Sequence, residues 1–181
     1  HGIAEANARS GRDADRVLTD EGREKVRRLV RRAREGGMWP TLILASPFAR
    51  ALETAQIAAK ALEHSDEIVT SNAFIPDASP EDAWDELRSH RDEPEVLLAS
   101  HQPLCGELMA FLLDAPNLHV DFRKAALACL LLAGGLLAPL GVAADEGQGG
   151  LIGTALAPYL LGGVSGLAAG LVARRLLYPP G

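Results

Sequence analysis

Two short apolar runs in this chain are each followed by a side chain suited to phosphate chemistry. Arg50 stands shortly after the run TLILA (41–45), and His101 directly follows the run VLLAS (96–100). A guanidinium grips phosphate oxygens through two parallel hydrogen bonds, and an imidazole exchanges protons near neutral pH. If a helix begins beside Arg50, its free N–H groups and positive dipole end add a seat for phosphate. The two positions together predict a phosphate site.

Both side chains need a strand to deliver them and a helix to follow. The two apolar runs are typical of short buried strands. SPFARALETAQIAAKALE, which follows the first run, predicts a helix with Ser46 as N-cap and Pro47 at its first position. LCGELMAFLL (104–113) predicts a helix after the second run. Further helices are predicted after an N-cap at Thr19 and within DASPEDAWDELRSH (77–90).

This alternation of helices and apolar strands predicts an α/β fold, a three-layer sandwich with a mostly parallel central sheet flanked by helices. In open α/β sheets, ligands bind beyond the carboxyl ends of the strands. We therefore expect Arg50 and His101 to face one pocket at that edge of the sheet.

Five segments then resemble a known family in the right order. They are HGIAE at the start, RVLTDEG (16–22), SPFARALETA (46–55), ASHQP (99–103) and FRKAALACL (122–130). Together they resemble the histidine phosphatase superfamily, the phosphoglycerate mutase-like proteins, and in particular the small bacterial phosphohistidine phosphatases. No single segment is specific, but five in sequence order are.

The resemblance implies a role for each matching residue. His1 matches the signature histidine that becomes phosphorylated, Arg50 a phosphate clamp, and His101 a second active-site histidine. Three further residues are expected to bind substrate on the same grounds: Gly2, Asn7 and Ser46. The implied reaction is a phosphoryl transfer in two steps through a phosphohistidine, with no metal and no cofactor.

The substrate class stays open between two kinds of phosphorylated molecule. Larger relatives protonate an alkoxide leaving group with an acidic residue. Here the candidates, Asp77, Glu81 and Asp82, are weak, because each is better explained as a solvated residue at a helix start. An imidazole leaving group needs less help, which favours a phosphohistidine protein of a signal-transduction relay. A small-molecule phosphomonoesterase is the alternative, and an inactive or membrane-anchored module is a third reading.

The beginning of the chain departs from the family pattern. Relatives carry an apolar strand ending in Arg directly before the signature histidine, whereas the printed sequence starts at that histidine. We therefore expect an N-terminally truncated catalytic domain over residues 1–132 that lacks the first strand and the signature Arg.

Net charge and cysteine content limit the kinds of partner and the cellular compartment that we expect. Eighteen Lys and Arg against 24 Asp and Glu give a net charge of -6, which argues against nucleic acid as a partner. Cys105 and Cys129 both lie in apolar runs and are expected to be reduced thiols, as in the cytoplasm. We expect a cytoplasmic monomer.

The C-terminal part, residues 133–181, is a Gly-, Ala- and Leu-rich tail with no counterpart in the family. Residues 125–144 and 151–173 are uncharged stretches of 20 and 23 residues, and Arg174 and Arg175 follow the second. Such lengths can cross a bilayer, so membrane contact through 151–173 is one hypothesis. An apolar tail packed on the domain and an unrelated fusion are the others.

Overall fold

A computed structural model describes the backbone of residues 1–133 and 136–144, and the side chains of residues 1–128. The chain divides into two compact units, of which the first is His1–Ala125 and the second begins at Ala126. In the second unit, β4 (Ala126–Ala133) and β5 (Leu136–Ala144) form an antiparallel hairpin with an irregularity between Cys129 and Leu130. All the residues expected at the site belong to the first unit.

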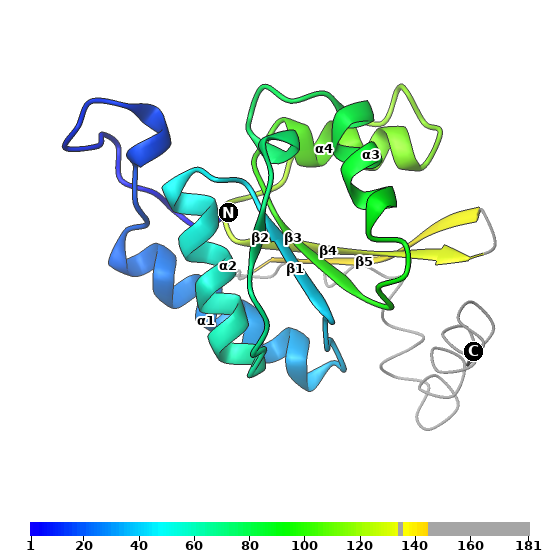
Figure 1. Cartoon of the computed structure of the whole chain (residues 1–181), viewed down its shortest axis with the longest axis horizontal. Coiled ribbons are helices and arrows are strands. Elements are labelled where there is room, and N and C mark those ends of the chain that lie inside the picture. Colours follow the sequence, from blue (N-terminus) through cyan, green and yellow to red (C-terminus); the bar gives the residue numbers. More distant parts are fainter. Residues whose placement is uncertain (134–135, 145–181) are drawn as a thin grey trace. The chain divides into compact units, whose positions relative to one another are not determined.

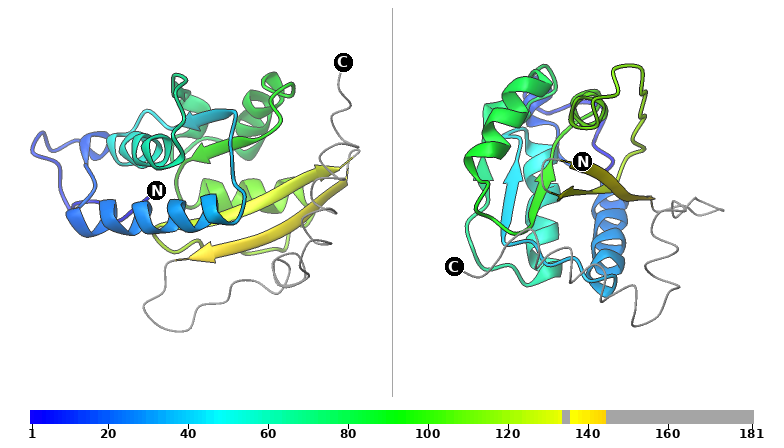
Figure 2. Two further views of the ribbon diagram at one scale, coloured as in Figure 1. Left: turned by 90° about the horizontal axis from the view of Figure 1, so that it is seen from below. Right: turned by 90° about the vertical axis from the view of Figure 1, so that its right-hand side faces the viewer.

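The first unit is built on a parallel sheet of three strands in the order β2-β1-β3. The strands are β1 (Leu42–Ala45), β2 (Val69–Thr70) and β3 (Val96–Ala99). β1 and β3 run in the same direction, with Ala45 opposite Ala99 in the register (Figure 2). Both strands therefore end at the same edge of the sheet, as the sequence predicted, and the chain leaves them side by side.

Helices cover both faces of this sheet, which confirms the predicted α/β class. The helices are α1 (Asp20–Glu35), α2 (Ala49–Leu62), α3 (Pro80–Ser89) and α4 (Leu104–Leu112). Alternate residues of β1 point to opposite faces: Ile43 packs with Ala55 of α2, and Leu44 packs with Ala83 of α3 and Leu104 of α4. Figure 1 shows β1 and β3 between α2 on one side and α3 on the other.

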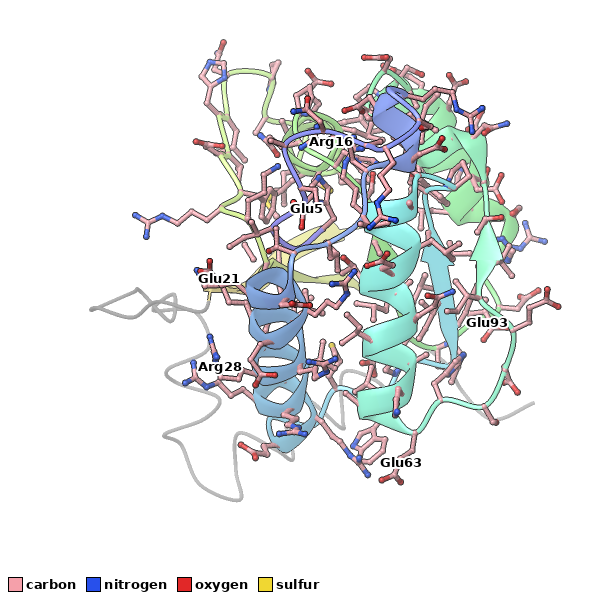
Figure 3. All side chains as sticks on the ribbon, turned by 90° about the vertical axis from the view of Figure 1, so that its left-hand side faces the viewer. Glu5, Arg16, Glu21, Arg28, Glu63 and Glu93 are labelled. Carbon is pink, nitrogen blue, oxygen red and sulfur yellow. The ribbon has the colours of Figure 1, made fainter. Side chains whose placement is uncertain are left out.

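α1 packs beside α2 and supports it from outside the sheet (Figure 3). The helix begins where predicted, because the Thr19 hydroxyl accepts a hydrogen bond from the Gly22 N–H at 2.9 Å. Val26 and Val30 lie one turn apart on its inner face and pack against Ala58 and Leu62 of α2. This contact fixes the helix whose first turn carries Arg50.

The predicted start of α2 is wrong by two residues. Ser46 is not its N-cap and Pro47 is not its first residue, since the helix begins at Ala49 after Phe48. The reason lies in the sheet: the Ser46 N–H donates to the Ala99 carbonyl at 3.0 Å, so Ser46 continues the ladder between β1 and β3. Arg50 still falls in the first turn of the helix.

Of the two uncharged stretches near the C-terminus, the structure describes most of residues 125–144 and none of residues 151–173. The first stretch, residues 125–144, contains both strands of the hairpin, β4 and β5. Among the described residues, no helix is long and apolar enough to span a bilayer. The stretch 151–173, on which the membrane hypothesis rests, lies outside the described residues.

Candidate active site

His1, Arg50 and His101 meet at the carboxyl edge of the sheet, although 49 and 51 residues separate successive members along the chain. The Nε of Arg50 lies 3.3 Å from the Nε2 of His1. The ring centroids of His1 and His101 are 5.0 Å apart, with the planes inclined at 62°. Phe48 closes one side, with its ring 5.3 Å from that of His101 and 5.0 Å from the guanidinium carbon of Arg50.

Backbone hydrogen bonds hold His1 in place on two sides. Its nitrogen donates to the carbonyl of Ser100, the residue after β3, at 2.9 Å. Its carbonyl accepts from the N–H of Ala125 at 3.1 Å. Because both bonds involve the main chain of His1, they fix where the imidazole begins without restricting what its ring nitrogens contact.

The contacts of the His1 ring define its tautomer. Nδ1 lies 2.7 Å from the carbonyl oxygen of Gly2, and a carbonyl only accepts, so Nδ1 carries the proton. Nε2 then has a free lone pair, which accepts from the Nε–H of Arg50. A guanidinium has no lone pair to offer, so both contacts require the same tautomer. This leaves Nε2 as the nucleophilic nitrogen.

Gly2 serves this arrangement through its backbone alone. A Cβ at this position would lie 2.9 Å from the Cγ2 of Val26 and 3.2 Å from the carbonyl of Gly22, which is closer than side chains pack. Its N–H donates to the Thr54 hydroxyl at 3.1 Å, and that hydroxyl donates to the Arg50 carbonyl at 2.7 Å. Thr54 thus links the peptide that holds the His1 ring to the first turn of α2.

Arg50 is buried, with only 5% of its surface exposed. Asp13, on the short 3-10 helix η1 (Asp13–Asp15), takes both terminal nitrogens of the guanidinium. Nη1 donates to the Asp13 carbonyl at 2.7 Å, and Nη2 donates to its carboxylate Oδ2 at 2.8 Å. Sequence reasoning missed Asp13 and Thr54. No local spacing points to Asp13, because 37 residues separate it from Arg50.

Asp13 also binds a second arginine. The Nη1 of Arg16 donates to the other carboxylate oxygen, Oδ1, at 2.7 Å. This hydrogen bond, together with the one from Arg50, lowers the pKa of Asp13 below its ordinary value, and partial burial opposes the shift. Asp13 therefore stays a carboxylate at neutral pH and is not a proton donor.

His101 is in the opposite state. The residue is 2% exposed, and neither ring nitrogen has a hydrogen-bond partner among the described residues. Its pKa is lowered to about 3, chiefly by burial and then by the positive charge of Arg50. A neutral ring with two unused nitrogens next to a buried guanidinium can receive one oxygen of a bound anion.

The remaining predicted residues lie less centrally. Ser46 is fully buried, and its hydroxyl accepts from the N–H of Phe48 at 3.3 Å. Asn7 is exposed in the loop of residues 5–17 and has no hydrogen bond to His1 within the part of the chain that the structure describes. The three candidate acids, Asp77, Glu81 and Asp82, are exposed at or just before the start of α3, where Asp82 bonds to the N-cap Ser79.

Comparisons with known proteins identify the family of the chain. Residues 1–75 match the family model of the histidine phosphatase superfamily (branch 1). An uncharacterised protein of Picosynechococcus sp. is 31% identical over 127 residues, which make up 69% of this chain and 77% of that protein.

Solved structures share the fold at lower identity. The protein histidine phosphatase SixA, complexed with tungstate, superposes with a TM-score of 0.74 at 24% identity, over 80% of this chain and 92% of that one. The α-ribazole phosphatase of Shigella flexneri gives 0.61 at 16% identity, over 77% and 91%. Phosphoserine phosphatase of Entamoeba histolytica, in complex with 3-phosphoglyceric acid, gives 0.59 at 15%, over 81% and 94%. With its five sequence segments, its parallel sheet and its matching relatives, the chain belongs to the histidine phosphatase superfamily.

Proposed function

We propose that this chain is a phosphohistidine phosphatase-like phosphohydrolase that works through a phosphohistidine intermediate on His1. One observation carries the proposal. The Gly2 carbonyl holds Nδ1 of His1 so that the lone pair of Nε2 faces the buried Arg50 guanidinium, beside the unpartnered ring of His101. A nucleophile, a cation and an unused polar group thus surround one small volume.

In the first step, Nε2 of His1 attacks phosphorus in line with the leaving group. The new bond joins Nε2 to phosphorus, and the bond from phosphorus to the leaving nitrogen or oxygen breaks. Once the lone pair of Nε2 is used in the new bond, the Nε–H of Arg50 donates to an arriving phosphate oxygen instead, and His101 binds another oxygen. These contacts stabilise the charge that spreads over the three equatorial oxygens in the transition state.

In the second step, water attacks the phosphorus of phosphorylated His1. The phosphorus–nitrogen bond breaks, phosphate leaves, and the electron pair returns to Nε2. The Nδ1–H stays bonded to the Gly2 carbonyl in both steps, so the ring keeps its orientation. Dividing one displacement into two is the general advantage of covalent catalysis.

A phosphohistidine protein is the substrate class that this site suits best. An alkoxide leaving group needs an acid nearby, and Asp13, the carboxylate bonded to Arg50, has a lowered pKa that keeps it ionised. The leaving imidazole of a phosphohistidine is a weaker base than an alkoxide and leaves with less assistance. Likeness in fold to α-ribazole phosphatase supports a small phosphate ester as the second candidate.

The test uses the full chain and a phosphorelay domain that carries ³²P on histidine. We expect label to transfer to His1 in an acid-labile, base-stable form, and His1→Ala to abolish both transfer and phosphate release. Label that survives acid would place the intermediate on another residue type and contradict the proposal.

A second measurement separates the two substrate classes. The kcat/KM on the phosphorylated domain is compared with that on α-ribazole phosphate and p-nitrophenyl phosphate. A higher value on either ester would select the phosphomonoesterase reading while keeping His1 as the nucleophile.

A further inference from the structure

The loop of residues 5–17 contains two aspartates, and only one of them contacts the site. A backbone hydrogen bond from Glu5 N–H to the Val17 carbonyl at 2.9 Å joins the ends of this loop. Figure 3 shows Arg16 near its end, and its Nε donates to the Glu5 carbonyl at 2.7 Å. Asp13 at the start of η1 faces inward to Arg50. Asp15 stays within the loop, bonded to Ser10 and Arg12.

From this arrangement we infer that Asp13 is the positioning residue of Arg50, and that it presents one edge of the guanidinium to the phosphate at His1. The inference rests on the proposed function and adds a residue to its site. Asp13 touches neither substrate nor nucleophile in this role and acts through Arg50.

The planar shape of the guanidinium explains how this works. Nη1 and Nη2 form its end edge, and Asp13 occupies that edge with its carbonyl at 2.7 Å and its Oδ2 at 2.8 Å. Nε–H and the second N–H of Nη2 form its side edge, which faces Nε2 of His1. Two anchored corners leave the plane no freedom to rotate. The side edge is therefore aimed at the place where phosphate oxygens arrive.

The bridge to Arg16 makes the anchor specific to a carboxylate. Oδ1 accepts from Arg16 and Oδ2 accepts from Arg50, so each oxygen serves a different guanidinium. An asparagine has one oxygen, and its amide N–H₂ would face the other guanidinium, donor against donor. Asp13→Asn therefore breaks one side of the bridge although its size is unchanged.

A competing role predicts the opposite sign. If Asp13 only filled an empty anion site as a stand-in for phosphate, removing its charge would free Arg50 and make the pocket more positive. Oxyanions would then bind more tightly. A positioning role predicts weaker binding, because Arg50 loses its orientation.

The experiment measures the affinity of the full chain for sodium tungstate, a tetrahedral oxyanion like phosphate, by titration calorimetry. For Asp13→Asn and Asp13→Ala we expect the tungstate Kd to rise about tenfold, the loss of one well-aimed charge-assisted contact. With a phosphohistidine substrate, kcat should fall by about 10- to 100-fold, as displaced catalytic groups cause. KM should change less than kcat.

Asp15→Asn is the matched control, because it removes a carboxylate of the same loop that has no recorded contact with Arg50. Its Kd and kcat should stay within about twofold of the parent, and thermal melting should show all three variants folded. Unchanged or tighter tungstate binding by a folded Asp13→Asn overturns this inference while leaving the proposed function standing. Failure of the parent chain to bind tungstate overturns both.

Discussion

Two strand–turn–helix segments within His1–Ala125 carry site residues that differ in their hydrogen bonding. β1 leads through Ser46 into α2, and β3 leads through Ser100 into α4, with Ala45 and Ala99 paired at the ends of the two strands. The first of these segments carries Arg50, whose three nitrogens are all hydrogen-bonded. The second delivers His101, whose two nitrogens have no partner among the described residues.

This difference shows which hydrogen bonds of the site the protein forms by itself and which a bound ligand would supply. Arg50 is charged and buried, and such a group is tolerable only when it is paired. It is therefore held before any substrate arrives. His101 avoids the cost of a buried charge by staying neutral, with a pKa lowered to about 3 chiefly by burial. Its two free nitrogens mark where the site is incomplete.

The largest expected effect on activity comes from replacing Arg50, the hydrogen-bonded residue of the pair. Arg50→Lys keeps the charge but cannot hold the carbonyl and the Oδ2 of Asp13 and reach phosphate at the same time. We expect kcat/KM on a phosphohistidine substrate to fall by about 10² or more, and Arg50→Ala to fall at least as far. Activity of Arg50→Lys within about threefold of the parent would mean that the positive charge alone suffices and that the planar guanidinium has no further role.

A smaller loss of activity is expected from replacing His101, whose ring nitrogens have no hydrogen-bond partner among the described residues. His101→Asn removes an imidazole that leaves no hydrogen-bond partner behind in the part of the chain that the structure describes, so its cost should fall on turnover more than on folding. We expect kcat to drop by about 10- to 100-fold with a melting temperature close to that of the parent. A large fall in melting temperature with normal turnover would show that His101 is a structural residue.

The comparison also predicts how stability depends on pH. The pKa of His101 is about 3 in the folded chain against an ordinary value of 6.5, so between these values the unfolded chain binds a proton that the folded chain does not. The free energy of unfolding should therefore decrease as pH falls from 6.5 towards 3. Urea unfolding at pH 7.0, 5.5 and 4.5 measures this decrease.

The same titration in His101→Asn supplies the control for that prediction. The variant lacks the titrating ring, so its unfolding free energy should fall less steeply over the same pH range than that of the parent. Equal slopes in the two proteins would mean that His101 has an ordinary pKa in the folded state.

The smallest effect is expected at Thr54, which joins the peptide after His1 to the first turn of α2. Thr54→Val removes the hydroxyl that joins the Gly2 N–H to the Arg50 carbonyl and keeps the shape of the side chain. The free energy of unfolding should decrease by about 1–2 kcal/mol, as for a lost hydrogen bond with a partly buried donor. Thr54→Ser, which keeps the hydroxyl, should recover most of this loss in the same denaturation experiment.

Much of this fold could be predicted because its signals are local. The apolar runs at β1 and β3, the N-cap at Thr19 and the helix after His101 are all marked by neighbouring residues. The predicted cap at Ser46 failed for a non-local reason. Its N–H is taken by the Ala99 carbonyl of another strand, and no residue near Ser46 indicates that bond.

By itself, the sequence determined the strands β1 and β3, the helices α1 to α4, and that Arg50 and His101 follow strands ending at the same edge of a parallel sheet. It did so because strand and helix preferences, and the direction of parallel strands, follow from residues close together in the chain. Only the tertiary structure decided the hydrogen bonding of those side chains. Asp13 reaches Arg50 across 37 residues and Thr54 reaches Gly2 across 52, while His101 finds no hydrogen-bond partner among the described residues. Such contacts depend on how a loop lies over a helix, and that is settled by packing between segments that no local pattern connects.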